Sequence, residues 1–190
     1  MSNEKLDIFR FKGAKALNGT IGNTALSNPS PGLGIVLARF TSTAHGLLAG
    51  SNIYLQSLAT DSYNGLRYLQ AVATDTFDVV LRKAYSALTP AGTEIWFCGA
   101  SYNINWDFIG FDLHLSAASA TSENIAVVRD AAAGSQYDTN LYTADMNTVA
   151  DVALLFDIPI PMLGGDVVKF TWANTNARTW GLSIYARPRA

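Results

Sequence analysis

The sequence predicts an all-β protein: an antiparallel β-sandwich or jelly roll with a small β-barrel-like module and little helix. Three observations lead to this prediction. About ten short segments alternate apolar and polar residues with the period of a strand. Turn residues separate these segments, as is typical of sandwiches and jelly rolls. Hydrophobic residues make up 49% of the 190 residues, which is enough to build a packed core.

Residues 1–33 are predicted to form an extended N-terminal arm. Residues 13–34 are rich in Gly, Asn, Ser, Ala and Pro, and neither strand nor helix periodicity persists through them. A long irregular segment is uncommon inside a compact domain and is usually functional or flexible. Two interpretations stay open: a solvent-exposed loop with a short strand or two, and an arm that lies on a neighbouring subunit.

Residues 34–90 are predicted to form a small antiparallel β module. Apolar residues alternate with polar ones in four short segments of this range, and each segment ends at turn residues. Strands are therefore expected at 34–40, 51–56, 66–72 and 77–81.

Glycine-containing turns are expected to connect the strands of this module. His45-Gly46 and Gly50 bracket a tight turn, because glycine readily adopts left-handed backbone conformations. Asn64-Gly65 predicts a two-residue hairpin, since a type I′ turn needs positive φ at both central residues.

Four turn signatures follow one another between residues 38 and 81. They are Ala44-His45-Gly46-Leu47, Gly50, Tyr63-Asn64-Gly65 and Val72-Ala73-Thr74-Asp75-Thr76-Phe77. Their order resembles that of a small β-barrel module that recurs in tail proteins and other virion proteins of tailed bacteriophages. That family usually has two threonines before the phenylalanine, where this chain has one. Known examples are structural or interaction modules, so the resemblance implies a virion protein made in the host bacterial cytoplasm.

Residues 91–190 are predicted to form a β-sandwich domain, either separate from the 34–90 module or continuous with it. Six segments of this range carry strand periodicity. A single helical turn over 141–146, capped near Asp138, is the only helix expected. The predicted strands cover 93–99, 103–115, 125–129, 150–158, 167–172 and 179–186.

Glycine and proline mark three special positions in this second half. The large apolar residues change phase at Gly110, which predicts a β-bulge or a sharp bend at Ile109-Gly110. Pro159 and Pro161 are expected to end the strand over 150–158, because proline cannot donate a ladder hydrogen bond. Gly165 and Asp166 are expected to form the next turn.

The composition argues against several classes of protein. The net charge is −2 and no Lys/Arg run is present, so nucleic-acid binding is not expected. Cys98 is the single cysteine, which excludes an intrachain disulfide and a cysteine-based zinc site, and its apolar neighbours predict an inert core thiol. No segment has the pattern of a secretory signal or the length of a membrane span, so no membrane partner is expected.

The two histidines give weak signals for chemistry. His45 lies in a glycine-flanked turn, where we expect it to form a structural hydrogen bond. His114 and Asp112 lie two residues apart on one strand face and could supply two metal ligands, but no further His, Cys or Glu cluster supports a metal site. We therefore expect no metal, no cofactor and no catalytic residue.

Carboxylates and aromatic residues leave two alternatives open. Asp107 and Asp112 flank the predicted bend, and a glycan hydrolase would need such a pair with different environments. Four tryptophans could build a sugar-stacking platform, although aromatic residues more often fill cores and subunit contacts. These residues are Trp96, Trp106, Trp172 and Trp180.

The function expected from these observations is non-enzymatic. The chain is predicted to be a structural component of a tailed-phage virion, in a tail, appendage or capsid-decoration position. Its expected partners are other virion proteins and copies of itself, in a trimer or a hexamer, because a sandwich must protect its edge strands. The alternatives are a carbohydrate- or receptor-binding sandwich module and, less favoured, a small glycan hydrolase.

Overall fold

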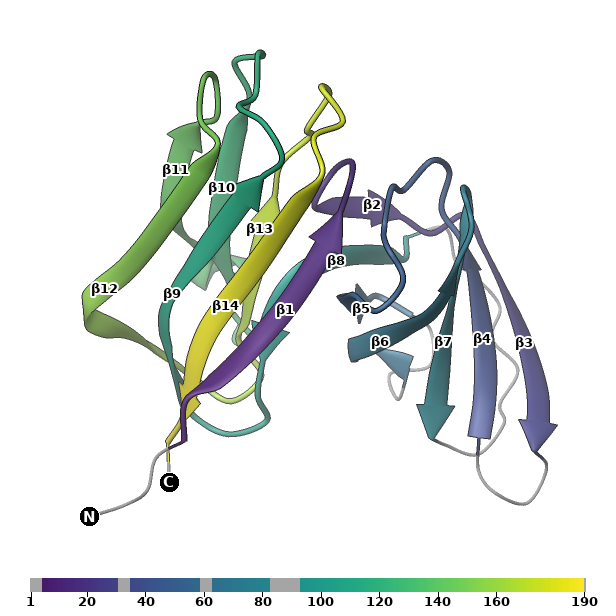
Figure 1. The fold of residues 1–190 in the computed structure, drawn as a ribbon. Helices are drawn as coiled ribbons and strands as arrows, with labels where there is room; N and C mark the ends of the chain where they lie inside the picture. The colour runs from purple at the N-terminus through teal and green to yellow at the C-terminus, as the bar shows by residue number, and fades with distance from the viewer. Residues whose placement is uncertain (1–4, 31–34, 59–62, 83–92, 190) are drawn as a thin grey trace.

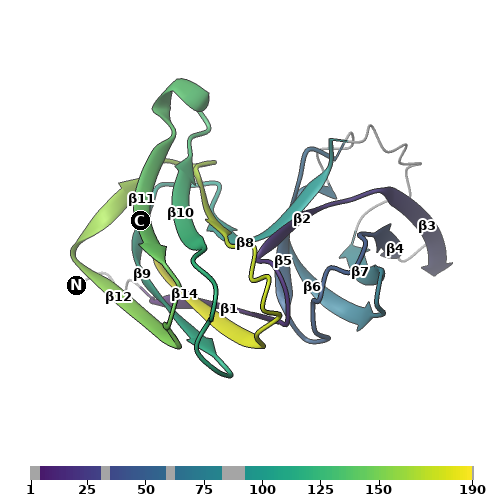
Figure 2. The ribbon, with the colours of Figure 1, turned by 90° about the horizontal axis from the view of Figure 1, so that it is seen from above.

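The computed structural model describes residues 5–30, 35–58, 63–82 and 93–189, and antiparallel strands dominate these ranges (Figure 1). Helical structure is limited to short 3-10 turns in these ranges, such as η2 (Ser135–Tyr137). The predicted all-β fold class is therefore confirmed. Figure 2 shows a sandwich and a smaller barrel side by side, with β2 and β8 running between them.

The sandwich consists of a four-stranded sheet packed against a second layer. The four-stranded sheet has the order β1 (Asp7–Gly13), β14 (Trp180–Pro188), β9 (Trp106–Leu115), β12 (Asp151–Met162). The second layer has the order β11 (Thr139–Asp145), β10 (Asn124–Asp130), β13 (Val167–Thr171), β8 (Ile95–Ser101). One hydrophobic core lies between them, centred on residues such as Phe108, Phe111, Phe170, Leu182 and Ile184.

The barrel continues from β8 and closes on itself. Its further strands follow in the order β5 (Asn52–Gln56), β6 (Gly65–Val72), β7 (Thr76–Arg82), β4 (Ile35–Thr41), β3 (Asn23–Ser30). The short β2 (Asn18–Thr20) directly precedes β3 and pairs with β8. Because β3 pairs with β4, the β2–β3 stretch joins the first and last strands of this sheet. A second core fills the barrel, with Phe40, Tyr63, Phe77 and Trp96 as its largest side chains.

Strand β8 belongs to both parts of the molecule. Its first half, Ile95 to Phe97, pairs with β5 on one side and β2 on the other. Its second half, from Cys98 to Ser101, pairs with β13 of the sandwich. Trp96 accordingly lies in the barrel core and Cys98 in the sandwich core. A single strand thus links the packing of the two cores.

The prediction of an extended arm is wrong for the described part of residues 1–33. Residues 7–13 form β1, which pairs with β14 over seven residues and buries Phe11. Residues 18–30 contain β2 and β3, so the alternative with short strands is nearer to the structure. Pairing within the chain satisfies backbone groups that a free arm would leave to water. The predicted boundaries at 33/34 and 90/91 lie outside the described residues.

The predicted bulge at Ile109-Gly110 is confirmed. Gly110 pairs with Tyr185 whereas Phe108 pairs with Ala186, so Ile109 is the extra residue. The bulge keeps Phe108 and Phe111 on the same buried face, although their spacing is odd. The change in phase therefore does not move the strand to the other face. Gly110 has a φ of +156°, and a Cβ there would collide with the carbonyl oxygen of Leu154 on β12.

The predicted two-residue hairpin at Asn64-Gly65 is wrong. β5 pairs with β6 so that Leu55 lies opposite Gly65, and the intervening residues form a longer connection. Gly65 has the expected positive φ, but Asn64 does not. Instead, Asn64 Oδ1 accepts a hydrogen bond from the amide of Leu58 at 2.8 Å, and this side chain closes the connection.

Two predictions about local secondary structure are also wrong. Residues 141–146 are expected to hold a helical turn, but they fall in β11 and the residue after it. Pro159 and Pro161 are expected to end a strand, but β12 runs through both to Met162. An edge strand tolerates proline because one of its sides needs no ladder hydrogen bonds. The pairing of β12 with β9 does break between Leu155 and Ile160.

Candidate functional site

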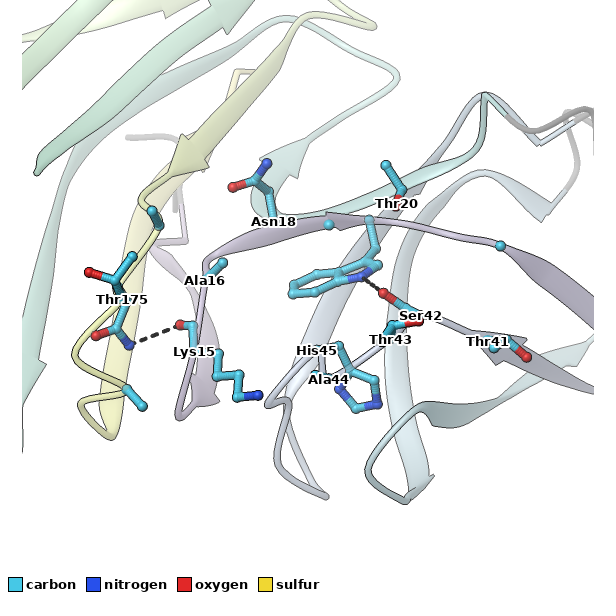
Figure 3. Close-up of a pocket in the computed structure, with 16 residues that line it drawn as sticks. Lys15, Ala16, Asn18, Thr20, Thr41, Ser42, Thr43, Ala44, His45 and Thr175 are labelled. Atoms are coloured by element: carbon cyan, nitrogen blue, oxygen red, sulfur yellow. Dashed lines mark hydrogen bonds between the residues drawn. The ribbon is translucent and has the colours of Figure 1, made fainter.

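A cavity lies between the sandwich and the barrel (Figure 3). Its volume is about 500 Å³, which is within the range of small-molecule and peptide sites. The sandwich contributes the turn before β14, the barrel contributes the turn after β4, and β2 lies between them. The residues that line it are Lys15, Ala16, Asn18, Gly19, Thr20, Gly22, Thr41, Ser42, Thr43, Ala44, His45, Trp96, Ala173, Asn174, Thr175 and Ala177.

Trp96 anchors the barrel side of this cavity. Its indole is 1% exposed, and its Nε1 donates a hydrogen bond of 2.9 Å to Oγ of Ser42. Gly19 on β2 lies directly against the ring, since a Cβ at this position would come within 2.7 Å of Nε1. The absence of a side chain at Gly19 therefore lets β2 pack on Trp96.

His45 has a structural role, as the sequence predicts. Its Nδ1 accepts a hydrogen bond from the amide of Leu47 at 2.9 Å, so the ring proton lies on Nε2, which faces the carbonyl oxygen of Thr76 at 3.2 Å. Burial lowers the pKa of His45 below its usual value. Both nitrogens are occupied by backbone groups, so this imidazole is not placed to act as a general base.

The turn at Gly46 brings the barrel close to the strand connection at Lys15. Gly46 has a φ of +65°, and a Cβ there would lie 2.6 Å from Cβ of Lys15. The amide of Ala14 donates to the carbonyl oxygen of Gly46 at 2.8 Å. These contacts hold residues 14 and 15 against the barrel.

The sandwich side of the cavity is held by Asn174 and Trp180. Asn174 is buried with a φ of +47°, and its side chain donates to the carbonyl oxygens of Lys15 and Arg178. Trp180 Nε1 also donates to the carbonyl oxygen of Lys15, at 2.6 Å. The next residue, Thr175, donates hydrogen bonds to the carboxylate of Glu123. The main chain of Lys15 is therefore bonded to the sandwich as well.

The cavity has the chemistry of a binding site. Its polar side chains are mostly hydroxyls and amides, together with the ammonium group of Lys15, and no carboxylate lines it in the described ranges. Ser42 already accepts the Trp96 hydrogen bond, and His45 is engaged by backbone groups. The described lining thus offers hydrogen bonds to a ligand but no nucleophile paired with a base.

The four predicted tryptophans do not form a platform. Trp96, Trp106, Trp172 and Trp180 are each at most 2% exposed, so none offers a ring face to a sugar. Three of them fill the sandwich core and Trp96 fills the barrel core. The alternative of a tryptophan platform for glycans is therefore contradicted, and the favoured interpretation of these residues as core holds.

Asp107 and Asp112 do not converge on one site. Asp107 has a nearly buried side chain that is ion-paired with Arg187 and Arg189 at the start of β9. These two guanidinium groups hold the pKa of Asp107 below its usual value. Asp112 lies beyond the bulge and accepts a hydrogen bond from the hydroxyl of Tyr185, which raises the pKa of that tyrosine. The arrangement does not pair two carboxylates across a substrate.

The other predicted positions have structural roles where they are described. His114 pairs with Asp151, with 2.5 Å between Nδ1 and Oδ1, and not with Asp112. Within the described residues, no cluster of three or more His, Cys, Asp or Glu side chains could hold a metal ion. Gly50 and Gly165 have positive φ in their turns. Asp166 is buried, and its carboxylate accepts hydrogen bonds from the amides of Ala132 and Leu163.

Sequence reasoning missed Lys15, Asn18 and Thr43 as lining residues. Lys15 and Asn18 lie in the segment predicted as an arm, where no periodicity indicated a partner. The turn at Asn174-Thr175-Asn176 could have been singled out, because asparagine tolerates positive φ and bonds to nearby backbone groups. Its position beside the barrel is a tertiary feature.

Comparisons with known proteins identify no relative. No protein-family model, no curated protein and no solved structure matches the chain. In the part of the chain that the structure describes, no helix is both long and apolar enough to cross a membrane.

Proposed function

We propose that this chain is a non-catalytic structural component of a tailed-phage virion. It acts by binding to copies of itself and to neighbouring virion proteins, and it forms a trimer or a hexamer. The resemblance of residues 38–81 to a virion barrel module supports this proposal. The motif residues Tyr63 and Phe77 lie in the barrel core, and His45 packs edge-on against Phe77 at a centroid distance of 5.5 Å. The motif thus serves packing and turns, as in a structural module.

The observation that carries the proposal is an apolar strip along the edge strand β12, which we call the β12 strip. Leu155 and Ile158 are 66% and 83% exposed. Leu163, in the turn after β12, and Ile104, which lies against that turn, are 60% and 54% exposed. An edge strand also presents unpaired backbone groups to one side. Exposed apolar groups gathered on a sheet edge are typical of a protein interface.

The proposal is tested by self-association of the purified full chain. Native mass spectrometry and sedimentation analysis are expected to show a discrete oligomer. Ile158→Asp is expected to shift the chain to monomer, because the charge would be buried at the interface without a partner. Tyr68→Asp, at an exposed position on β6 of the barrel, is the matched control and is expected to leave the oligomer intact.

A second measurement addresses the virion itself. Particles of the phage that encodes the chain are purified and analysed by mass spectrometry and by antibody labelling in electron microscopy. The chain is expected in intact particles at a fixed position and copy number. Its absence from purified particles, or a strict monomer at high concentration, would contradict the proposal.

A further inference from the structure

A second described cavity lies on the outer face of the four-stranded sheet. It shares no lining residue with the cavity between the sandwich and the barrel. Its volume is about 400 Å³. The alternate residues Phe11, Leu113 and Leu182 are buried in the core, so their neighbours on each strand face outward. We call this cavity the sheet groove. Its outward-facing residues are Arg10, Lys12, Asp112, His114, Gly181 and Ser183.

The strand register places these side chains in two rows across the sheet. Lys12, Gly181 and His114 lie opposite one another on β1, β14 and β9. The adjacent row contains Arg10, Ser183 and Asp112. Gly181 therefore lies between Lys12 and His114, and a Cβ there would meet no atom within 4 Å. The missing side chain leaves open space over the middle of the sheet.

One wall of the sheet groove is cationic. Arg10 and Lys12 are two residues apart on β1, which places their Cα atoms about 7 Å apart on the same face. Both are exposed, and within the described residues neither side chain has a hydrogen-bonding or ion-paired partner. Their backbone is held in place, because Arg10 O accepts from Asn52 and Lys12 N donates to Ser51. Two unpaired cations on a rigid strand suit an anionic group.

The opposite wall offers hydrogen-bond acceptors. Asp112 accepts one hydrogen bond from Tyr185 through Oδ1, which leaves Oδ2 for a ligand hydroxyl. Asp151 holds Nδ1 of His114 at 2.5 Å, so Nε2 of His114 is directed away from that carboxylate. Ser183 lies between the two walls; its hydroxyl bonds that of Tyr185 and can still accept a hydrogen bond from a ligand. Carboxylate, imidazole and hydroxyl groups at this spacing suit the neighbouring hydroxyls of a sugar ring.

An aromatic side chain stands at the barrel end of the sheet groove. Tyr68 is 62% exposed. Its hydroxyl and Nζ of Lys12 each lie 3.4 Å from the position that a Cβ of Gly50 would occupy. Lys12 and Tyr68 thus both lie over Gly50, which has a φ of +79° and lines the groove. An exposed tyrosine supplies a ring face to a neighbouring sugar unit.

We propose that the sheet groove binds a sugar residue that carries an anionic substituent, a carboxylate or a phosphate. Arg10 and Lys12 bind the anion, the sugar ring lies over Gly181, and Asp112, His114 and Ser183 bind its hydroxyls. A neutral sugar would leave both cations without partners. A small inorganic anion would leave the space over Gly181 empty. This glycan site is independent of the assembly role proposed above.

The proposal is tested by titrating the full chain with four probes and following backbone amide signals by NMR. The probes are glucuronic acid, glucose 6-phosphate, glucose and inorganic phosphate. Either acidic sugar is expected to produce saturable shifts at residues 10–12, 112–114 and 181–183, with a dissociation constant of about 1 mM for so few contacts. Whichever of the two binds more tightly identifies the anionic substituent.

Variants distinguish binding in the sheet groove from a general effect of the protein's charge. Arg10→Gln and Lys12→Gln are each expected to weaken binding about tenfold through the loss of a charge-assisted hydrogen bond. Gly181→Leu is expected to abolish binding by filling the groove, and circular dichroism checks that it folds. Lys5→Gln removes the same charge roughly 17 Å along the chain from Arg10 and is the matched control that keeps full affinity.

Three outcomes would overturn the proposal. The first is equal affinity for glucose and for the acidic sugars, which would exclude a role for the cations. The second is equal affinity for inorganic phosphate and for the acidic sugars, which would exclude a role for the ring site. The third is a folded Gly181→Leu variant that binds as tightly as the natural chain.

Discussion

At the residue scale, buried polar side chains fix the turns of this protein. Asp166 bonds the amides of two separate turns, and Asn174 bonds the carbonyl oxygens of Lys15 and Arg178. His45 accepts a hydrogen bond from the amide of Leu47 and so fixes the turn at Gly46. A buried polar group is tolerated when its hydrogen bonds are satisfied, and these groups are satisfied by backbone atoms that no strand uses. Turn residues here therefore contribute to tertiary structure as well as to local geometry.

Asp107 makes stability depend on pH in a defined window. Arg189 and Arg187 lower the pKa of Asp107 in the folded chain. A carboxyl with a depressed folded pKa stabilises the fold above its unfolded pKa, near 3.9, and loses this effect as the pH falls through the folded pKa. Asp107→Asn is therefore expected to lower the free energy of unfolding at pH 7 by about 1–3 kcal/mol.

Urea unfolding between pH 2 and pH 7 measures this effect. The difference between Asp107→Asn and the natural chain is expected to shrink below about pH 4 as the carboxyl is protonated. The exposed Asp157 is the matched control, and Asp157→Asn is expected to change stability by less than about 0.5 kcal/mol. A difference that stays constant down to pH 2 would contradict the assignment to ionised Asp107.

At the element scale, the bulge in β9 lies in a strand that pairs with two neighbouring strands. β9 is paired on both sides, with β14 and with β12, and both pairings shift register near Gly110. The sequence predicted the position of the bulge from the change in hydrophobic phase. It did not predict that the buried face would stay the same, because that depends on the residue inserted into the ladder. Gly110 is required because a Cβ at this position would collide with the carbonyl oxygen of Leu154 on β12.

Two glycines of the same sheet are expected to respond differently to alanine. Gly110→Ala places a Cβ against the backbone of Leu154 and is expected to destabilise the chain by about 1–3 kcal/mol through overpacking. Gly181→Ala meets no atom within 4 Å and is expected to be neutral or to stabilise by up to about 1 kcal/mol. Thermal and urea unfolding of both variants provide the comparison. Equal effects of the two substitutions would contradict the close approach of β12.

At the scale of the whole molecule, β8 connects two hydrophobic cores. Trp96 and Cys98 are two residues apart and lie in different cores. The connection at Lys15 is bonded to both parts, through Ala14 on the barrel side and Trp180 on the sandwich side. Loss of either core would thus remove partners from β8. We infer that the two parts unfold as one cooperative unit.

Cys98 reports on this coupling. Burial raises the pKa of the Cys98 thiol well above its usual value, so the thiol is expected to be unreactive toward a thiol reagent in the folded chain. Phe40→Ala removes a buried ring from the barrel core and is expected to destabilise by about 3–5 kcal/mol. The midpoint of Cys98 labelling in urea is expected to fall together with that of circular dichroism.

This test also needs a control substitution on the surface and a comparison of the two unfolding curves. Tyr137→Ala, on the exposed η2, is the control and is expected to leave both midpoints unchanged within error. If Phe40→Ala moves the circular dichroism curve while Cys98 stays protected to the natural midpoint, the sandwich unfolds on its own.

The sequence by itself determined the fold class, most strands and several turns. Alternation at Phe77, Val79 and Leu81 predicted a half-buried strand because side chains alternate between two faces, and all three are buried. Glycine identified the turn at Gly46 and the bulge at Gly110, since each position needs a conformation or a close approach that other residues resist. These are local properties, so the local order of residues is enough to predict them.

Only the tertiary structure decided which strands meet and what covers each face. β1 pairs with β14 at the opposite end of the chain, and this pairing turns a predicted arm into part of the sandwich. The four tryptophans became core because both of their faces are covered, which periodicity does not reveal. Arg10 and Asp112 share a groove because β14 aligns their strands. Strand pairing joins residues that are remote in the chain, so the candidate sites emerged only once the partners of each strand were known.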